Sequence, residues 1–221
     1  MSISLQLQGI LAELPHNVRL VAVSKFHPAE DILEAYDVGQ RIFGESKVQE
    51  LCAKYEVLPK DIAWHFIGHL QSNKVKYIVP FVSLIHGVDS LKLLLEIDRQ
   101  AKKCDRKIAV LLQLHIAQEE TKFGFSFGEC LDLVASDEFL ACRNIEICGL
   151  MGMASNTDDE LLAIEEFKGL AAFFNDLQAS HFSQQESFKE LSIGMSEDYL
   201  LAIAQGSTMV RIGSKIFGQR N

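Results

Sequence analysis

The sequence predicts an α/β protein folded as a single (β/α)8 barrel of the TIM type. Eight apolar, β-branched runs recur along the chain, and segments with helical periodicity separate them. Each run is continuously apolar rather than alternating, which is typical of parallel strands covered on both faces. The 221 residues show no linker and no shift in composition, so we expect one domain over residues 1–221. A doubly wound open sheet has the same local pattern, but the count of eight favours the closed barrel.

The strands are expected where the apolar runs lie. In chain order these are residues 19–25, 41–46, 64–69, 83–90, 107–117, 145–155, 190–196 and 208–218. Barrels of this kind usually take about 250 residues, so the loops must be short. We expect the barrel to fill the chain, with no C-terminal β domain.

Helices are expected before the first strand and after each strand. The opening stretch MSISLQLQGILAEL lacks the basic start and cleavage site of a secretion signal, so it is interpreted as a helix. Pro28 starts the next helix in its first turn and Gly39 stops it, and Ser46 with Gln49 forms a capping box for the third. The other helices are expected around residues 75–79, 91–95, 131–134, 164–174 and 199–203.

Composition argues against several classes of partner. The formal net charge is -9, and lysine clusters such as KKCDRK are short and interrupted by acid, so no nucleic acid is expected. No apolar run approaches the roughly 20 residues of a membrane-spanning helix, so no membrane is expected either. The five cysteines form no C-x-x-C pair, which predicts reduced thiols and a cytoplasmic location.

Functional chemistry is expected at the carboxyl ends of the strands, where TIM-type barrels place their active sites. The first run, RLVAVSK, ends in Lys25 shortly before Pro28. An ammonium left unpaired in an apolar setting costs several kcal/mol. Lys25 therefore either marks the exit of the strand into water or is present for the chemistry of its nitrogen.

The loops after the seventh and eighth strands predict an anion site, because many barrels bind a phosphate there. Glycine lets backbone N–H groups approach an oxyanion closely, and a helix N-terminus adds unpaired donors. The alternative is ordinary N-capping of the following helices by Ser196 and Ser214. The candidate residues of the two loops are Ser192, Gly194, Met195, Ser196, Gly213 and Ser214.

Arg211 lies inside the eighth run and shares side-chain parity with Met209 and Gly213, so its guanidinium is expected in the barrel mouth. A buried arginine needs a partner, and the two interpretations are contact with a ligand and an ion pair with Asp89 or Glu45. A phosphorylated aldehyde held as a Schiff base would unite a lysine, an anion site and this arginine. Pyridoxal 5'-phosphate (PLP) is such an aldehyde.

Ordered motifs run along nearly the whole chain: VAVSK, FGESKVQEL, WHFIGHLQSNK, HGVDS, EETKFGF, GLMGMA, LSIGMSED and GSTMVRIGSKIFG. They resemble the pyridoxal phosphate homeostasis proteins, the YggS or PROSC family, which is related to the barrel domain of alanine racemase. The resemblance implies a fold type III barrel with Lys25 as the Schiff-base lysine and Arg211 toward the pyridine nitrogen. It also implies Ser192, Gly213 and Ser214 around the phosphate, and a role in vitamin B6 and amino-acid homeostasis without a demonstrated turnover.

Several positions depart from the common pattern of that family. Ser46 stands where an Asn usually lies beside the cofactor, and Lys47 stands where an aromatic residue is frequent. His69 replaces a usual Pro and His115 a frequent Asn, whereas Ser214 replaces a Thr and keeps the hydroxyl. We count Ser46 among the expected cofactor contacts.

Other functions give different expectations. A racemase-like PLP enzyme needs a second acid or base opposite Lys25, which alanine racemase takes from a tyrosine of its C-terminal β domain. Because no such domain is expected here, we predict a monomeric carrier or regulator that serves PLP-dependent apo-enzymes without efficient catalysis. A ligand-free interaction protein would leave Lys25 and Arg211 unexplained.

A metal-dependent barrel hydrolase is the alternative that the histidines suggest. Imidazoles near the ends of successive strands can bind zinc, and the candidates are His65, His69, His86 and His115. However, no His-x-His opens the first strand and no acidic ligand ends the eighth. We therefore expect no metal site.

Overall fold

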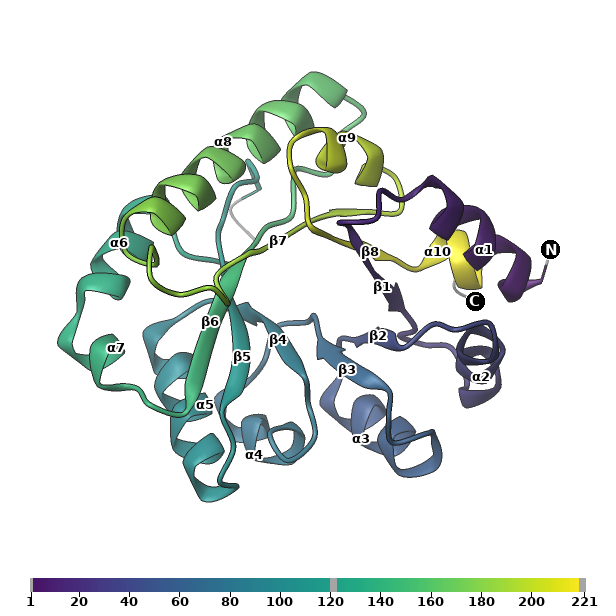
Figure 1. Cartoon of the computed structure of the whole chain (residues 1–221), viewed down its shortest axis with the longest axis horizontal. Coiled ribbons are helices and arrows are strands. Elements are labelled where there is room, and N and C mark those ends of the chain that lie inside the picture. Colours follow the sequence, from purple (N-terminus) through teal and green to yellow (C-terminus); the bar gives the residue numbers. More distant parts are fainter. Residues whose placement is uncertain (1, 120–122, 219–221) are drawn as a thin grey trace.

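The computed structural model describes residues 2–119 and 123–218, and in them eight parallel strands close into a barrel (Figure 1). Each strand pairs with the next along the chain, and β8 pairs with β1, so the predicted (β/α)8 barrel is confirmed. The strands are β1 (Arg19–Val23), β2 (Ile42–Glu45), β3 (Ala63–Phe66), β4 (Leu84–Val88), β5 (Ile108–Gln113), β6 (Ile145–Met151), β7 (Glu190–Met195) and β8 (Met209–Ile212).

The helices surround this barrel, and α1 and α10 lie side by side on its outside (Figure 1). They are α1 (Ile3–Glu13), α2 (Ala29–Asp37), α3 (Val48–Val57), the 3-10 turn η1 (Ser72–Lys74), α4 (Val75–Ile78), α5 (Leu91–Lys103), α6 (Phe127–Ala135), α7 (Asp137–Ala141), α8 (Glu160–Ala179), α9 (Tyr199–Ala204) and α10 (Ser214–Phe217). The motif EETKFGF lies partly outside the described residues.

Local signals explain where some of the helices begin and end. The predicted N-terminal helix is confirmed, and its N-cap Ser2 accepts a hydrogen bond from the backbone of Leu5. Gly39, with φ of 102°, follows α2 as expected, because a left-handed residue ends a helix at little cost when it is glycine. The capping box predicted at Ser46 is wrong: residues 46 and 47 stay outside the helix, and α3 begins at Val48.

The core has two parts. The larger part lies between strands and helices and includes Phe43, Trp64 and Phe167, all fully buried. A smaller cluster fills the inside of the barrel, and its members are Val21, Leu84, Leu111, Met151 and Met209. The space inside the barrel is therefore packed along part of its length, as expected for this fold.

Two further expectations concern membranes and thiols. Within residues 2–119 and 123–218, no helix combines the length and the apolar character that crossing a membrane requires. All five cysteines lie in this part of the chain as free thiols, with Cys130 buried and Cys104 exposed. Burial raises the pKa of the Cys130 thiol to about 12, which keeps it protonated and unreactive at neutral pH.

Candidate functional site

A pocket of about 620 Å³ opens where the loops after β1, β6, β7 and β8 come together. Its floor includes Ile67 and Met153, which also pack against the cluster inside the barrel. The pocket therefore lies at the carboxyl end of the strands, as predicted. Six of the residues predicted from sequence line it: Lys25, Met195, Ser196, Arg211, Gly213 and Ser214.

Three predicted contact residues lie outside the pocket wall. Ser46 packs against the loop after β3, where a Cβ atom placed on Gly68 would lie 2.5 Å from the Ser46 carbonyl oxygen. Gly194 has φ of 92°, and a Cβ there would lie 2.7 Å from Ala202 Cβ, so this glycine allows α9 to pack closely. Ser192 is fully buried. None of these three residues lines the pocket, and their predicted contact with the cofactor stays a prediction.

Lys25 lies in a tight turn directly after β1. The turn is closed by a hydrogen bond from His27 N–H to the Ser24 carbonyl (3.1 Å), and Lys25 is half-buried within it. Phe26 has φ of 69°, in the left-handed region, which costs a residue other than glycine roughly 1–2 kcal/mol. Such strain persists where surrounding contacts fix the backbone, and it is common at functional sites.

Arg211 is held from below by oxygen atoms. Its Nη1 donates to both the carbonyl and the Oγ of Ser192 at 2.7 Å, and its Nη2 donates to the Gly152 carbonyl at 3.0 Å. Ser192 Oγ lies 3.0 Å from His86 Nδ1, and His86 Nε2 lies 3.0 Å from His65 Nδ1. A chain of buried polar groups therefore fixes the guanidinium at the edge of the pocket.

Burial sets the charges along this chain. It lowers the pKa of Arg211 to about 10, which leaves the guanidinium charged at neutral pH. It lowers the pKa of His65 to about 3, and it moves that of His86 well below its usual value, so both imidazoles are neutral. Arg211 thus contributes a fixed positive charge to the pocket, and the two neutral histidines behind it add none.

The ion-pair interpretation of Arg211 is not supported. Glu45 Oε1 lies 2.7 Å from Lys54 Nζ, and Asp89 Oδ2 lies 2.7 Å from His69 Nδ1. Both carboxylates that the sequence offered are therefore engaged elsewhere. Arg211 reaches the pocket with neutral oxygen atoms as its hydrogen-bond partners, which leaves its charge available to a ligand.

The loops after β7 and β8 are joined to each other. Gly213 N–H donates to Ser196 Oγ at 3.2 Å, so both loops share one rim of the pocket. A Cβ on Gly213 would lie 3.0 Å from the Val23 carbonyl oxygen, so glycine lets this rim pack tightly on β1, two residues before Lys25. The rim therefore brings the hydroxyls of Ser196 and Ser214 to the same pocket as Lys25.

The N-capping alternative for these serines is wrong. The N-cap of α9 is Asp198 and the N-cap of α10 is Gly213, and neither of these helices in the described chain has a side-chain cap. Ser196 and Ser214 are thus not used as helix caps. Their hydroxyls are consistent with the predicted anion site.

Sequence reasoning missed the wall of the pocket that lies next to this rim. The loop after β6 lines the pocket with Ser155, Asn156, Thr157 and Asp158. Glu166 of α8 holds this loop, accepting hydrogen bonds from the N–H and the Oγ of Ser155, both at 2.6 Å. The run of polar residues directly after the sixth apolar segment was the available signal, because it lies at the carboxyl end of a strand.

The histidines do not gather into a metal centre. His65 and His86 bond to each other, His69 bonds to Asp89, and His115 Nε2 lies 2.9 Å from the Glu119 carbonyl oxygen. In the described residues, no group of three or more His, Cys, Asp or Glu side chains could hold a metal ion.

Comparison with known protein families and curated sequences gives a consistent picture. A model of the family described as alanine racemase, N-terminal domain, matches residues 3–221. A pyridoxal phosphate homeostasis protein of Synechocystis sp. is 41% identical over 217 residues, covering 96% of this chain and 95% of that protein. The protein of the same name from Homo sapiens is 38% identical over 213 residues, covering 92% of this chain and 77% of its own length.

Solved structures show the same similarity. PipY of Synechococcus elongatus PCC7942, without PLP, has a TM-score of 0.90 and 37% identity, covering 98% of this chain and 100% of PipY. PipY with PLP bound has a TM-score of 0.86 with the same identity and coverage. Alanine racemase from Bartonella henselae has a TM-score of 0.74 at 16% identity, covering 99% of this chain and 59% of that enzyme, which shows a shared fold.

Proposed function

We propose that this chain, which belongs to the family of the pyridoxal phosphate homeostasis proteins built on the alanine racemase N-terminal domain, binds PLP as a Schiff base on Lys25. Its role would be in intracellular vitamin B6 and amino-acid homeostasis, as a carrier or regulator. The name shared by its relatives and the PLP-bound structure of PipY support the choice of cofactor. The attachment to Lys25 is our inference from the pocket.

The observation that carries the proposal is one pocket that combines a lysine, a buried arginine and three serine residues. PLP supplies an aldehyde, which condenses with a neutral primary amine to form a C=N bond and release water. Lys25 provides that amine. Ser196, Gly213 and Ser214 form the rim for the phosphate, because hydroxyl and backbone N–H donors suit a dianion.

Arg211 sets the electronic character of the site in this proposal. A guanidinium is a donor that keeps its proton at neutral pH, so it would meet the pyridine nitrogen as a hydrogen-bond donor. The nitrogen then stays unprotonated, and the ring withdraws electrons weakly. The pocket residues would favour holding the cofactor over promoting the chemistry of amino acids.

The same pocket supports a carrier rather than an efficient racemase. Among the described residues that line it there is no histidine, tyrosine or cysteine, so a second proton-transfer group would have to be a carboxylate such as Asp158 or Glu160. We expect interconversion of L- and D-alanine far below the roughly 1–1000 per second of typical enzymes. A turnover within that range would favour the racemase-like alternative.

The proposal also includes a location and partners. We place the protein in the cytoplasm as a monomer that passes PLP to PLP-dependent apo-enzymes. The free thiols of all five cysteines, which lie in the described residues, support a reducing compartment.

The test is absorbance and intact mass after borohydride reduction. Wild type loaded with PLP should be yellow, lose that colour on reduction and gain the mass of one cofactor. Lys25→Ala should show neither change, whereas Lys47→Ala, which removes an exposed lysine after β2, should behave as wild type. Full labelling of Lys25→Ala would contradict the assignment of this lysine.

A further inference from the structure

The two peptide groups that flank Lys25 are both hydrogen-bonded to charged side chains of α3. The Ser24 carbonyl, which belongs to the preceding peptide bond, accepts a hydrogen bond from Lys54 Nζ at 2.8 Å. Phe26 N–H, which belongs to the following peptide bond, donates to Glu50 Oε1 at 2.6 Å. The backbone of Lys25 is therefore fixed on both sides from one helix.

These contacts belong to a single network. Lys54 Nζ also donates to Glu45 Oε1 and to Glu50 Oε1, each at 2.7 Å, so its three ammonium hydrogens have three acceptors. Glu45 Oε1 accepts a further hydrogen bond from Ser24 Oγ at 2.7 Å. One buried lysine thus connects the end of β2, the start of α3 and the turn that carries Lys25.

The network buries charged groups, which costs free energy that apolar packing would not require. Glu45 is 0% exposed and Lys54 is 7% exposed, and buried ion pairs often stabilise a fold no better than well-packed apolar residues. Glu45 Oε2 has no hydrogen-bond partner in the part of the chain that the structure describes. Phe26, whose N–H the network holds, adopts the left-handed backbone conformation. Strain and buried charge together at one turn indicate a functional constraint.

The charged residues of the network act from behind the site. Glu45, Glu50 and Lys54 are not among the described residues that line the pocket, whereas Lys25 is. We therefore expect these three residues to affect ligand binding through the turn at Lys25.

We propose that Lys54, Glu45 and Glu50 form a clamp that positions Lys25 for covalent capture of PLP. By fixing the peptide groups before and after Lys25, the clamp holds the strained turn from which the amine enters the pocket. These three are positioning residues, and the inference rests on the proposed function of Lys25.

The chain offers a matched pair of variants to test the clamp. Glu50 is partly exposed, so Glu50→Ala removes the acceptor of Phe26 N–H without opening the core. Glu34 plays a similar part elsewhere, because its Oε1 accepts a hydrogen bond from Ser4 N–H at 3.0 Å and ties α2 to α1. Glu34→Ala is the control, and Glu50→Gln restores an acceptor oxygen for Phe26.

Two measurements read out the clamp. PLP titration should give a dissociation constant at least tenfold higher for Glu50→Ala than for wild type, with Glu34→Ala unchanged and Glu50→Gln within about threefold of wild type. In the PLP-free proteins, amide hydrogen exchange at Phe26 should be at least tenfold faster in Glu50→Ala alone. Borohydride trapping of wild type, run alongside, tests the proposed function separately.

The outcomes separate the two ideas. Unchanged PLP affinity and unchanged exchange at Phe26 in Glu50→Ala would overturn the clamp, as would an equal loss of affinity in Glu34→Ala. Absence of a covalent label in wild type would overturn the proposed function instead, and the exchange at Phe26 would still decide whether the clamp orders the turn.

Discussion

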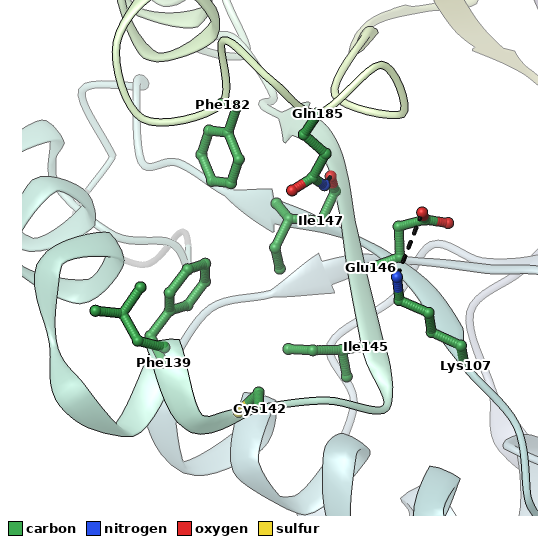
Figure 2. Close-up of a pocket in the computed structure, with 9 residues that line it drawn as sticks. Lys107, Phe139, Cys142, Ile145, Glu146, Ile147, Phe182 and Gln185 are labelled. Atoms are coloured by element: carbon green, nitrogen blue, oxygen red, sulfur yellow. Dashed lines mark hydrogen bonds and ion pairs between the residues drawn. The ribbon is translucent and has the colours of Figure 1, made fainter.

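Two hollows of the barrel differ in how their polar groups are used. The mouth pocket has a volume of about 620 Å³ and is lined by charged and hydroxyl groups that converge on it. The second hollow, the seam pocket, lies outside β6 and has a volume of about 160 Å³. In Figure 2, Phe139, Ile145, Ile147 and Phe182 surround the seam pocket, mainly through apolar side chains.

The polar groups around the seam pocket are used by the protein itself. Lys107 Nζ pairs with Glu146 Oε1 at 3.6 Å, on the side of β6 away from Ile145 and Ile147 (Figure 2). Gln185 Nε2 donates to the Ile147 carbonyl at 2.5 Å. The comparison teaches that a binding site is marked by charged and hydroxyl groups that face open space, whereas at the seam pocket polar groups are already paired within the protein. Substitutions should therefore affect stability at the seam pocket and ligand binding at the mouth.

The largest expected effect is on stability, at the seam pocket. Phe182 is buried, and its ring stacks on that of Phe188 with centroids 4.2 Å apart. Phe182→Ala should lower the free energy of unfolding by about 3–5 kcal/mol, because a buried aromatic side chain is lost and a cavity is left. Urea unfolding measures this, and PLP affinity at low temperature should stay as in wild type. Weakened PLP binding by the folded variant would contradict the assignment of the seam pocket to stability alone.

The second expected effect is acid sensitivity behind the mouth pocket. The pKa of His65 falls from 6.5 to about 3 on burial, so between these values the unfolded chain binds more protons than the folded one. The contribution of His65 to the free energy of unfolding is therefore complete above pH 6.5. It decreases as the pH falls toward 3, by up to about 1.4 kcal/mol per pH unit.

Urea unfolding at several pH values checks this slope. His65→Asn should show a shallower dependence than wild type between pH 6.5 and 5, whereas His16→Asn, at an exposed position, should keep the full slope. Equal slopes for wild type and His65→Asn would show that this imidazole does not titrate on unfolding as described.

A third effect concerns ligand affinity at the rim of the mouth. Ser196→Ala combined with Ser214→Ala should raise the dissociation constant of PLP by at least tenfold, because a hydrogen bond to a charged group contributes about 1.5–3 kcal/mol and each 1.4 kcal/mol is tenfold. For Ser214→Ala alone, the free energy of unfolding should change by less than about 1 kcal/mol, since Ser214 is exposed. Titration of apo-protein with PLP and with pyridoxal separates the phosphate contribution, and an equal loss for both ligands would contradict the assignment of this rim.

The smallest effect is expected at the ion pair beside the seam pocket. The side chain of Lys107 is 58% exposed, and exposed ion pairs contribute little. Lys107→Ala should change the free energy of unfolding by less than about 0.5 kcal/mol and leave PLP binding unchanged. Thermal unfolding in low and high salt checks this, and a loss above 1 kcal/mol would assign the ion pair a structural role.

The parts of the molecule that the sequence predicted depend on local patterns. Continuous apolar runs are enough to locate parallel strands, and the position of Lys25 at the end of the first run placed it at the mouth. Side-chain parity along the eighth run placed Arg211 near Gly213, and both line the pocket. These inferences hold because strand periodicity acts over a few residues.

The parts that the sequence missed depend on contacts between distant elements. The pairing of β7 with β8 shifts register between Ser192 and Met195, and Ser192 lies buried beneath Arg211. An irregularity of this kind leaves no mark in the apolar pattern. Glu50 and Lys54 likewise have the spacing of an ordinary surface pair on a helix, and only the fold shows that they reach the turn at Lys25.

The central claim is a covalent link between Lys25 and PLP, and the most direct measurement is a peptide map of wild-type protein after loading with PLP and reduction by borohydride. The account predicts the added mass on the peptide that contains Lys25, at close to one label per chain. A label located mainly on another lysine, or spread over several exposed lysines, would contradict it.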